Sequence, residues 1–297
     1  MAPSPTSVFV SAPDGLRLHV REWGPRLDPR LPLVCLPGLT RTAEDFDVLA
    51  AALAARGRRV LALDYRGRGR SDYDSDPARY AIPVELADVS AVLTVREARP
   101  AVFLGSSRGG LIAMVLAAQE PAAIAGAILN DIGPVIEPKG LMRIKGYVGK
   151  LPAPRDYADG GEILRRLFGQ QFPKVDKAGW EAAARRAWRE DKAGLAPTYD
   201  VRIAQTLEAI GPDTPVPALW PQFDALAGMP VMAIRGANSD LLSPETVAAM
   251  RQRHPALEAI EVPDQGHTPL LAEDDIIGRI AAFIDRCDAA RPAAPAS

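Results

Sequence analysis

Hydrophobic residues along the chain follow two patterns. Near the N-terminus they alternate with polar residues at 8–10 and 16–20, on either side of the turn Pro13-Asp14-Gly15. Strict alternation is typical of antiparallel strands with one exposed face, so we expect a hairpin here. Five later runs are continuously apolar, as in strands buried on both faces of a parallel sheet: 31–36, 60–63, 101–104, 124–129 and 230–234.

Segments with apolar residues three and four positions apart lie between and after these runs, which predicts helices. They cover residues 43–56, 84–96, 109–119, 244–253 and 270–286. Repeated alternation of strand and helix favours an open, mostly parallel sheet with helices on both faces. The predicted fold class is therefore α/β.

Residues 134–222 interrupt the alternation, because they contain helical pieces separated by prolines and no strand-like run. The pieces are 140–148, 162–168, 179–191 and 198–209. We expect a helical lid at 134–222, inserted in a core made of 1–133 and 223–297. For Trp180 and Trp188 we favour packing over the lining of a substrate pocket. Residues 291–297 are predicted to form a disordered tail.

Composition narrows the functional classes. The 297 residues are 47% hydrophobic and 24% charged, with a net charge of −2, which gives no reason to expect nucleic acid or a membrane as partner. Cys35 lies in an apolar run and is interpreted as a core residue, and two distant cysteines, Cys35 and Cys287, fit a reducing compartment. Neither a leader-like start nor a run of about 20 apolar residues occurs. We expect a cytoplasmic protein that acts on a small molecule, and the sequence predicts no oligomeric state.

The segment Gly105-Ser-Ser-Arg-Gly-Gly110 carries the first candidate chemistry. It follows an apolar run and precedes a helix, and Gly-x-Ser-x-Gly at a strand–turn–helix junction predicts a nucleophile elbow at Ser107. The flanking glycines suit a tight, strained turn, and the helix N-terminus favours developing negative charge. Ser106 is the alternative serine, but the glycine spacing frames Ser107.

Acyl transfer at such a serine needs donors for the oxyanion, usually two backbone N–H groups. We predict that one comes from Arg108, the residue after the nucleophile. The second is expected from Leu39, in the Leu36-Pro-Gly-Leu39 turn after the third predicted strand.

A general base and an acid complete the prediction. Of the three histidines, His267 begins the last helix after a short strand, at the same sheet edge as Ser107. His19 is expected in the exposed hairpin and His254 at a helix end, both as structural or surface groups. The acid should lie between serine and histidine in chain order, which favours Asp240 and leaves Asp131 as the alternative.

Three motifs together resemble the α/β-hydrolase superfamily. They are the elbow at 105–110, the Asp64-Tyr-Arg-Gly-Arg-Gly-Arg-Ser71 loop and Gly266-His-x-Pro269. The resemblance covers residues 7–287 and implies an α/β-hydrolase fold in which Arg66 and Ser71 hold the loop. Arg108 departs from the Met, Leu or Gln often found there, so its charge favours an acidic substrate or pairs with a carboxylate such as Asp131.

These observations predict a serine hydrolase that needs neither metal nor organic cofactor. Epoxide hydrolases and haloalkane dehalogenases of this superfamily carry aspartate where this chain has serine. We expect a carboxylesterase for small or medium acyl esters, working through an acyl-enzyme. The same triad can serve lactone hydrolysis, hydrolysis of carbon–carbon bonds in vinylogous diketones, or perhydrolysis. A non-catalytic ligand-binding protein on this fold is the alternative of another class.

Overall fold

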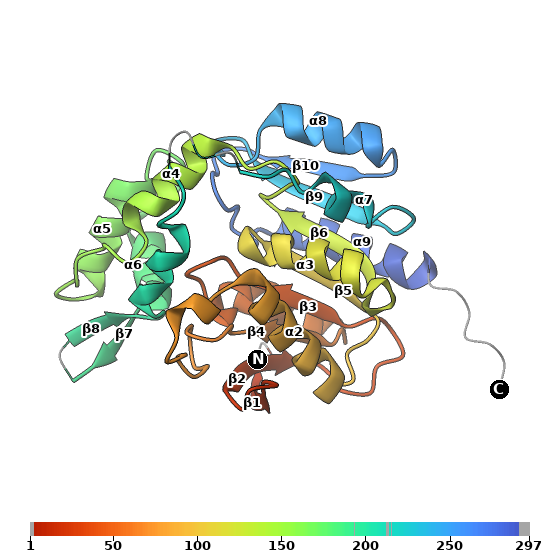
Figure 1. Cartoon of the computed structure of the whole chain (residues 1–297), viewed down its shortest axis with the longest axis horizontal. Coiled ribbons are helices and arrows are strands. Elements are labelled where there is room, and N and C mark those ends of the chain that lie inside the picture. The colour runs from red at the N-terminus through yellow and green to blue at the C-terminus, as the bar shows by residue number, and fades with distance from the viewer. Residues whose placement is uncertain (1–2, 193, 212–213, 215, 291–297) are drawn as a thin grey trace.

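The computed structural model describes residues 3–192, 194–211, 214 and 216–290, so the predicted tail at 291–297 lies outside it. A sheet of eight strands occupies the centre, in the order β1-β2-β4-β3-β5-β6-β9-β10 (Figure 1). The strands are β1 (Thr6–Ser11), β2 (Arg17–Trp23), β3 (Leu33–Leu36), β4 (Val60–Leu63), β5 (Ala101–Ser106), β6 (Ile124–Asn130), β9 (Val231–Gly236) and β10 (Glu258–Val262).

The pairing of the strands confirms both sequence patterns. β1 and β2 form an antiparallel hairpin in which Val8 lies opposite Val20, and β2 pairs antiparallel with β4. Every other neighbouring pair in this sheet is parallel. The sheet is therefore mostly parallel, as predicted, with its antiparallel part at the N-terminal edge.

Helices cover both faces of the sheet, and alternate strand side chains meet them. Val34 and Leu36 of β3 point to the face that packs against α2 (Ile82–Val95), α3 (Arg108–Gln119) and α8 (Pro244–Arg253). Leu33 and Cys35 point to the opposite face, with α1 (Asp47–Ala55) and α9 (Asp274–Ala290). Figure 1 shows this layered arrangement. Short 3₁₀ helices complete the layers at η1 (Ala43–Phe46), η2 (Pro77–Arg79) and η3 (Pro121–Ala123).

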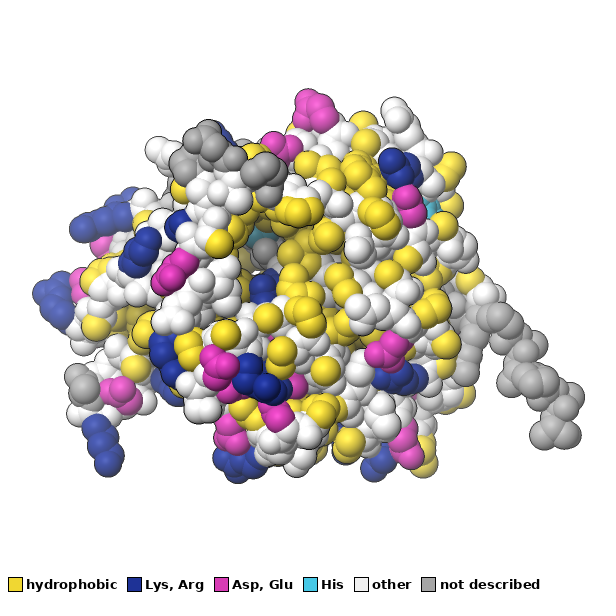
Figure 2. Space-filling model, in the orientation of Figure 1, with side chains coloured by type: hydrophobic (Ala, Val, Ile, Leu, Met, Phe, Trp, Pro, Cys, Tyr) yellow, Lys and Arg dark blue, Asp and Glu magenta, His cyan; other side chains and the backbone are white. Residues whose placement is uncertain are grey.

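The first part of the chain between β6 and β9 lies beyond one end of the sheet, and its last helix lies beside α3 (Figure 1). Its elements are α4 (Pro138–Tyr147), α5 (Tyr157–Phe168), α6 (Lys177–Ala187), β7 (Trp188–Asp191), β8 (Gly194–Pro197), η4 (Val201–Leu207) and α7 (Trp220–Asp224). We call residues 134–222 the insert. Figure 2 shows that the molecular surface is hollowed between the insert and the core. The division of the chain into a core and a lid remains a prediction.

The insert differs from the prediction in one element. The helix expected over 179–191 ends at Ala187, and residues 188–191 pair with Gly194–Pro197 as a short hairpin. The expectation that no strand occurs in the insert is therefore wrong. Trp188 is 1% exposed and packs with Trp180, so burial of this side chain outweighs the local helical pattern. Both tryptophans contribute to a hydrophobic cluster of the insert, as the packing interpretation predicted.

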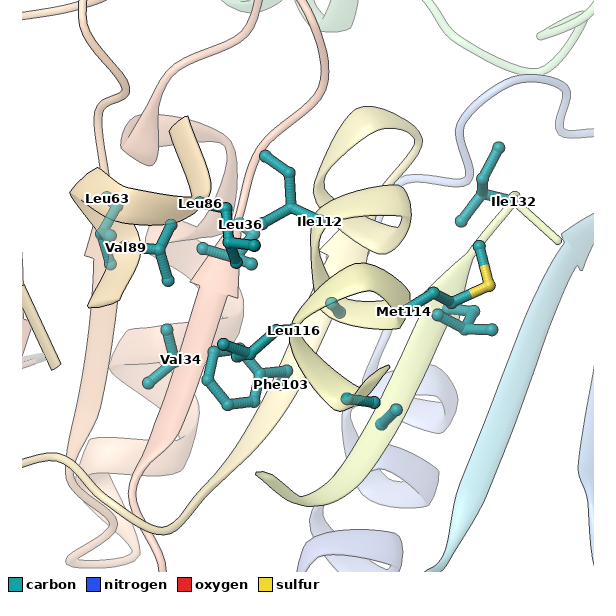
Figure 3. Close-up of a cluster of buried hydrophobic side chains, with 14 of the residues drawn as sticks. Val34, Leu36, Leu63, Leu86, Val89, Phe103, Ile112, Met114, Leu116 and Ile132 are labelled. Carbon is teal, nitrogen blue, oxygen red and sulfur yellow. The ribbon is translucent and has the colours of Figure 1, made fainter. Parts of the chain in front are cut away.

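The core around β3 and β5 supports the nucleophile region. In Figure 3 the side chains of Val34, Leu36 and Phe103 meet Leu86 of α2 and Leu116 of α3. Each of these side chains is at most 4% exposed, and their close packing holds α3 against the sheet. Cys35, on the other face, is completely buried, and burial raises the pKa of its thiol, as expected for a core residue. Across the described ranges, no helix combines the length and apolar character that a membrane span requires.

Candidate active site

Ser107 lies at the sharp turn between β5 and α3. Its backbone has φ 51° and ψ −115°, a conformation that a residue with a side chain rarely adopts. A Cβ atom on Gly105 would lie 2.3 Å from the backbone nitrogen of Gly110, and one on Gly109 would lie 2.0 Å from the carbonyl oxygen of Leu36. Only glycine fits at these two positions, so the predicted tight turn is confirmed, with the serine held at its apex.

The neighbouring serine has a different environment. Ser106 is 8% exposed, and its Oγ accepts a hydrogen bond of 2.9 Å from the side-chain amide of Asn130. That amide also donates to the carbonyl of Pro269, at 3.2 Å, and so joins the end of β6 to the loop after β10. Ser106 therefore contributes to the scaffold beneath the turn.

His267 meets the hydroxyl of Ser107. The loop after β10 brings its Nε2 to 2.8 Å from Ser107 Oγ, as the sequence predicted, and the imidazole is 6% exposed. The backbone N–H of His267 lies 3.4 Å from the side-chain oxygen of Gln171, a residue of the insert. The insert thus contacts the loop that carries the histidine.

The carboxylate at His267 belongs to Asp131 and not to Asp240, so the preference for Asp240 is wrong. Asp131 Oδ2 lies 2.8 Å from His267 Nδ1, and Asp131 is completely buried. Asp131 directly follows β6, which is the immediate neighbour of β5 in the sheet. Because β6 lies beside β5, Asp131 is within reach of the imidazole of His267. The sequence analysis had kept Asp131 as the alternative.

Two groups from the loop after β9 fix the carboxylate of Asp131. The backbone N–H of Gly236 donates to Oδ1 at 2.9 Å, and the hydroxyl of Ser239 donates to Oδ2 at 2.6 Å. These bonds give both carboxylate oxygens of this buried side chain a donor, and leaving them without one would be costly. The loop after β9 was predicted to supply the acid itself. It instead supplies the hydrogen-bond donors that hold Asp131. Ser239 had no recognisable sequence signal beyond standing next to Asp240.

Asp240 has a different partner. Its carboxylate accepts two hydrogen bonds from Arg143 of α4, from Nε at 2.6 Å and from Nη2 at 2.8 Å. Burial raises the pKa of Asp240, but the charge and hydrogen bonds of Arg143 outweigh burial and leave the pKa below its usual value. Asp240 therefore joins the insert to the core. The arginine that holds it lies in an amphipathic helix and carried no sequence signal of its own.

The two predicted oxyanion donors lie on either side of the nucleophile. Arg108 is the first residue of α3, and the loop that carries Leu39 passes beside Ser107, since a Cβ on Gly38 would lie 3.8 Å from Ser107 Cβ. Within the described part of the chain, neither the Leu39 nor the Arg108 backbone N–H has a hydrogen-bond acceptor. Their availability is what an oxyanion hole requires, and their role stays a prediction.

The side chain of Arg108 is bound by Glu85 and by the backbone of Tyr80. Its Nε donates to Glu85 of α2 at 2.5 Å, and its Nη2 donates to the carbonyl of Tyr80 at 2.9 Å. The suggested pairing with a carboxylate is confirmed, but the partner is Glu85 and not Asp131. The sequence did not reveal Glu85 as the partner of Arg108, because Glu85 lies in a helix whose pattern indicated only packing.

The other two histidines lie away from Ser107. His254 follows α8 as predicted, and its Nε2 contacts the carbonyl of Met229 at 3.0 Å. His19 lies in the hairpin as predicted and is a structural and not a surface group, because it is 1% exposed and its Nδ1 lies 2.7 Å from Asp64. Over the ranges that the structure describes, no group of three or more His, Cys, Asp or Glu residues could hold a metal ion.

Comparisons with known proteins agree with this geometry. The model of the alpha/beta hydrolase family matches residues 33–279. The chain is 36% identical to a 3-hydroxybutyrate-oligomer hydrolase from Cupriavidus necator, over 92% of this chain and 95% of that protein. It is 28% identical to the sn-1-specific diacylglycerol lipase ABHD11 of Mus musculus, over 81% of this chain and 76% of the lipase.

A solved structure is similar over almost the whole chain. It is an alpha/beta hydrolase from Novosphingobium aromaticivorans, 41% identical, with a TM-score of 0.89 over 96% of this chain and 99% of that one. The related hydrolases indicate an enzyme that catalyses hydrolysis. The matched family model spans well over half of the chain. With its central sheet, serine turn and buried histidine, this chain therefore belongs to the alpha/beta hydrolase family.

Proposed function

We propose that the protein is a serine hydrolase that cleaves carboxylic esters through an acyl-enzyme. The observation that carries the proposal is the continuous series of contacts from Ser107 Oγ through the imidazole of His267 to the carboxylate of Asp131, each 2.8 Å long. A histidine held by a carboxylate can remove the proton of a serine hydroxyl, and the serine then becomes a nucleophile.

The proposed reaction has two halves. Ser107 Oγ attacks the ester carbonyl carbon while His267 Nε2 takes its proton, and the N–H groups of Leu39 and Arg108 bind the oxyanion. The tetrahedral intermediate collapses, the carbon–oxygen bond to the alcohol breaks, and His267 returns the proton to the leaving alkoxide. Water then repeats the attack on the acyl-enzyme, and carboxylic acid and free Ser107 result.

Oligoesters of short hydroxy acids are the substrate class that we favour. The reason is the 36% identity, over nearly the full length of both chains, to a protein named for hydrolysis of 3-hydroxybutyrate oligomers. Each linkage of such an oligomer is a carboxylic ester between small units, which agrees with the small or medium acyl group expected from the sequence. Cleavage leaves one new carboxylate and one new hydroxyl.

A labelling experiment combined with product analysis tests the proposal. A fluorophosphonate probe should label the wild-type protein at Ser107, and a Ser106→Ala control should label equally, because Ser106 is held by Asn130. Mass spectrometry of reactions with the 3-hydroxybutyrate trimer should show dimer and monomer.

The same panel includes p-nitrophenyl esters, lactones and an aryl vinylogous diketone. Turnover of the diketone without any ester turnover would replace the ester assignment by carbon–carbon bond hydrolysis. A folded protein that neither reacts with the probe nor turns over any substrate would favour the ligand-binding alternative.

A further inference from the structure

A buried carboxylate lies behind the turn that carries Ser107. Glu85 of α2 is completely buried, and its two oxygens face two arginines. Arg108 Nε donates to Oε2 at 2.5 Å, and Arg68 Nη1 forms an ion pair with Oε1 at 2.7 Å. Burial alone raises the pKa of Glu85, but the charges of Arg68 and Arg108 outweigh it and hold the pKa below its ordinary value. We call these three residues the Glu85 clamp.

Each arginine of the clamp leads to one of the two predicted oxyanion donors. Arg108 carries one donor on its own backbone. Arg68 reaches the other by donating from Nε to the carbonyl oxygen of Leu39 at 2.9 Å. One hydrogen bond therefore joins Leu39 to Arg68, and ion pairs join Arg68 to Glu85 and Glu85 to Arg108.

The position of Arg68 is closely defined by its surroundings. Its side chain is 0% exposed, and Nη1 also donates to the carbonyl of Arg66 at 2.7 Å. The guanidinium lies over the rings of Tyr65 and Tyr80, at 5.7 and 5.4 Å from the ring centroids. These contacts fix the guanidinium of Arg68 between Glu85 and the carbonyl of Leu39.

We propose that Glu85 is a positioning residue that sets the separation of the two oxyanion donors. This inference rests on the proposed ester hydrolysis, since the donors matter only when an oxyanion forms between them. Oxyanion donors work at 2.7–3.1 Å from the charge, and a misplacement of about 1 Å can lower a rate about 100-fold. Glu85 touches no reacting atom, so its effect is exerted through Arg68 and Arg108.

The chain offers a matched control for a purely structural role. Glu22 is also buried between two arginines, with Arg59 Nε at 2.7 Å and Arg96 Nη2 at 2.6 Å. It lies on β2 opposite Leu61, near the start of β4 and thus towards the sheet edge opposite to Ser107. Glu22→Gln and Glu85→Gln therefore break similar ion pairs, and only the second connects to the oxyanion donors.

The experiment compares both variants with the wild type on a p-nitrophenyl ester. Glu85→Gln is expected to lower kcat about 10- to 100-fold with KM changed less than about two-fold, because ground-state contacts remain. Binding of an aryl trifluoromethyl ketone, which forms a tetrahedral adduct with Ser107, should weaken by a similar factor. Glu22→Gln should keep the kcat and the ketone affinity of the wild type. Equal losses in both variants, or wild-type values for Glu85→Gln, would overturn the inference.

A third variant covers the case in which Glu85→Gln does not fold. Replacing the whole clamp by apolar residues (Arg68→Met, Glu85→Leu and Arg108→Met) leaves no buried charge, and such replacements are often tolerated. The triple variant keeps the backbone N–H of residue 108 and should still show the low kcat. A folded triple variant with wild-type kcat contradicts the inference alone. A wild-type protein without ester turnover contradicts the proposed function instead.

Discussion

Two Ser–His–Asp groupings with nearly the same bonding occur in different regions of this molecule. We call them the elbow triad (Ser107, His267, Asp131) and the hairpin triad (Ser7, His19, Asp64). In the elbow triad the Oγ–Nε2 and Nδ1–Oδ2 distances are both 2.8 Å. In the hairpin triad they are 2.5 and 2.7 Å. Bond lengths alone therefore do not distinguish the two groupings.

The surroundings of the two serines differ. Ser107 stands in a strained turn at the N-terminus of α3, beside backbone N–H groups without acceptors. Ser7 lies within the regular edge strand β1, and its Oγ also accepts a hydrogen bond of 2.7 Å from Arg70. In the described part of the chain, the residues after Ser7 continue strand β1 to Ser11 instead of starting a helix whose N-terminus would favour an oxyanion. We propose that the backbone around Ser107 makes it the reactive serine of the two.

The carboxylate and the cavity at the hairpin triad point to a structural role. Asp64 also accepts hydrogen bonds from the backbone N–H groups of Ala43, at 2.7 Å, and Arg70, at 3.1 Å, and so ties the hairpin to two loops. His19 and Asp64 line a cavity of about 390 Å³ between the core and the insert. A cavity beside a histidine is therefore present here as well, and we propose that this site is structural.

Removing each serine is the strongest test of this difference. Ser107→Ala should lower kcat for a p-nitrophenyl ester by at least about 10⁴-fold, because the nucleophile is lost. Ser7→Ala should leave kcat within about two-fold of the wild type, since only an exposed hydroxyl on an edge strand is removed. Steady-state kinetics on both variants measure the effect. Fluorophosphonate labelling of Ser7 in the Ser107→Ala protein would refute the distinction.

The two aspartates should give a smaller but still clear contrast. Asp131→Asn should lower kcat by about 10³- to 10⁴-fold, because the amide no longer holds the imidazole in the tautomer that accepts the serine proton. Asp64→Asn should instead destabilise the fold by about 1–3 kcal/mol through its buried bonds, with kcat of the folded protein unchanged. Urea unfolding and kinetics on the same preparations separate these outcomes. A loss of kcat in folded Asp64→Asn would give the hairpin triad a part in catalysis.

The sequence was sufficient to predict those parts of the site that depend on local backbone chemistry. Gly105 and Gly109 mark the turn because no other residue fits their contacts, so the glycine spacing together with the flanking strand and helix predicted a tight turn at Ser107. The parallel sheet followed from the apolar runs, since strands buried on both faces cannot alternate. His267 followed from its place at the carboxyl edge of the sheet.

What the sequence could not predict depends on which strands are neighbours. Choosing between Asp131 and Asp240 required knowing that β6 lies beside β5 and that Arg143 of the insert already holds Asp240. The burial of His19 likewise depends on packing of the hairpin against the loop after β4. Contacts between residues distant in the chain leave no periodic pattern, so these features emerged only in three dimensions.

The smallest expected effect concerns the third aspartate, Asp240, which lies near the elbow triad but pairs with Arg143. Its folded pKa is depressed, so the ion pair contributes full stability above the unfolded pKa of about 3.9 and loses it as pH falls through the lower folded value. Asp240→Asn should therefore cost on the order of 1 kcal/mol at pH 7, and its stability should approach that of the wild type as the pH falls through the folded pKa of Asp240. Urea unfolding at pH 7 and at a series of lower pH values measures this, with Asp275→Asn as a control because its pair with Arg279 is exposed. The kcat of Asp240→Asn should fall less than about 10-fold, because the imidazole keeps Asp131. A loss as large as that of Asp131→Asn would mean that Asp240 acts on His267 during turnover, and two carboxylates would then share the role that the comparison assigns to one.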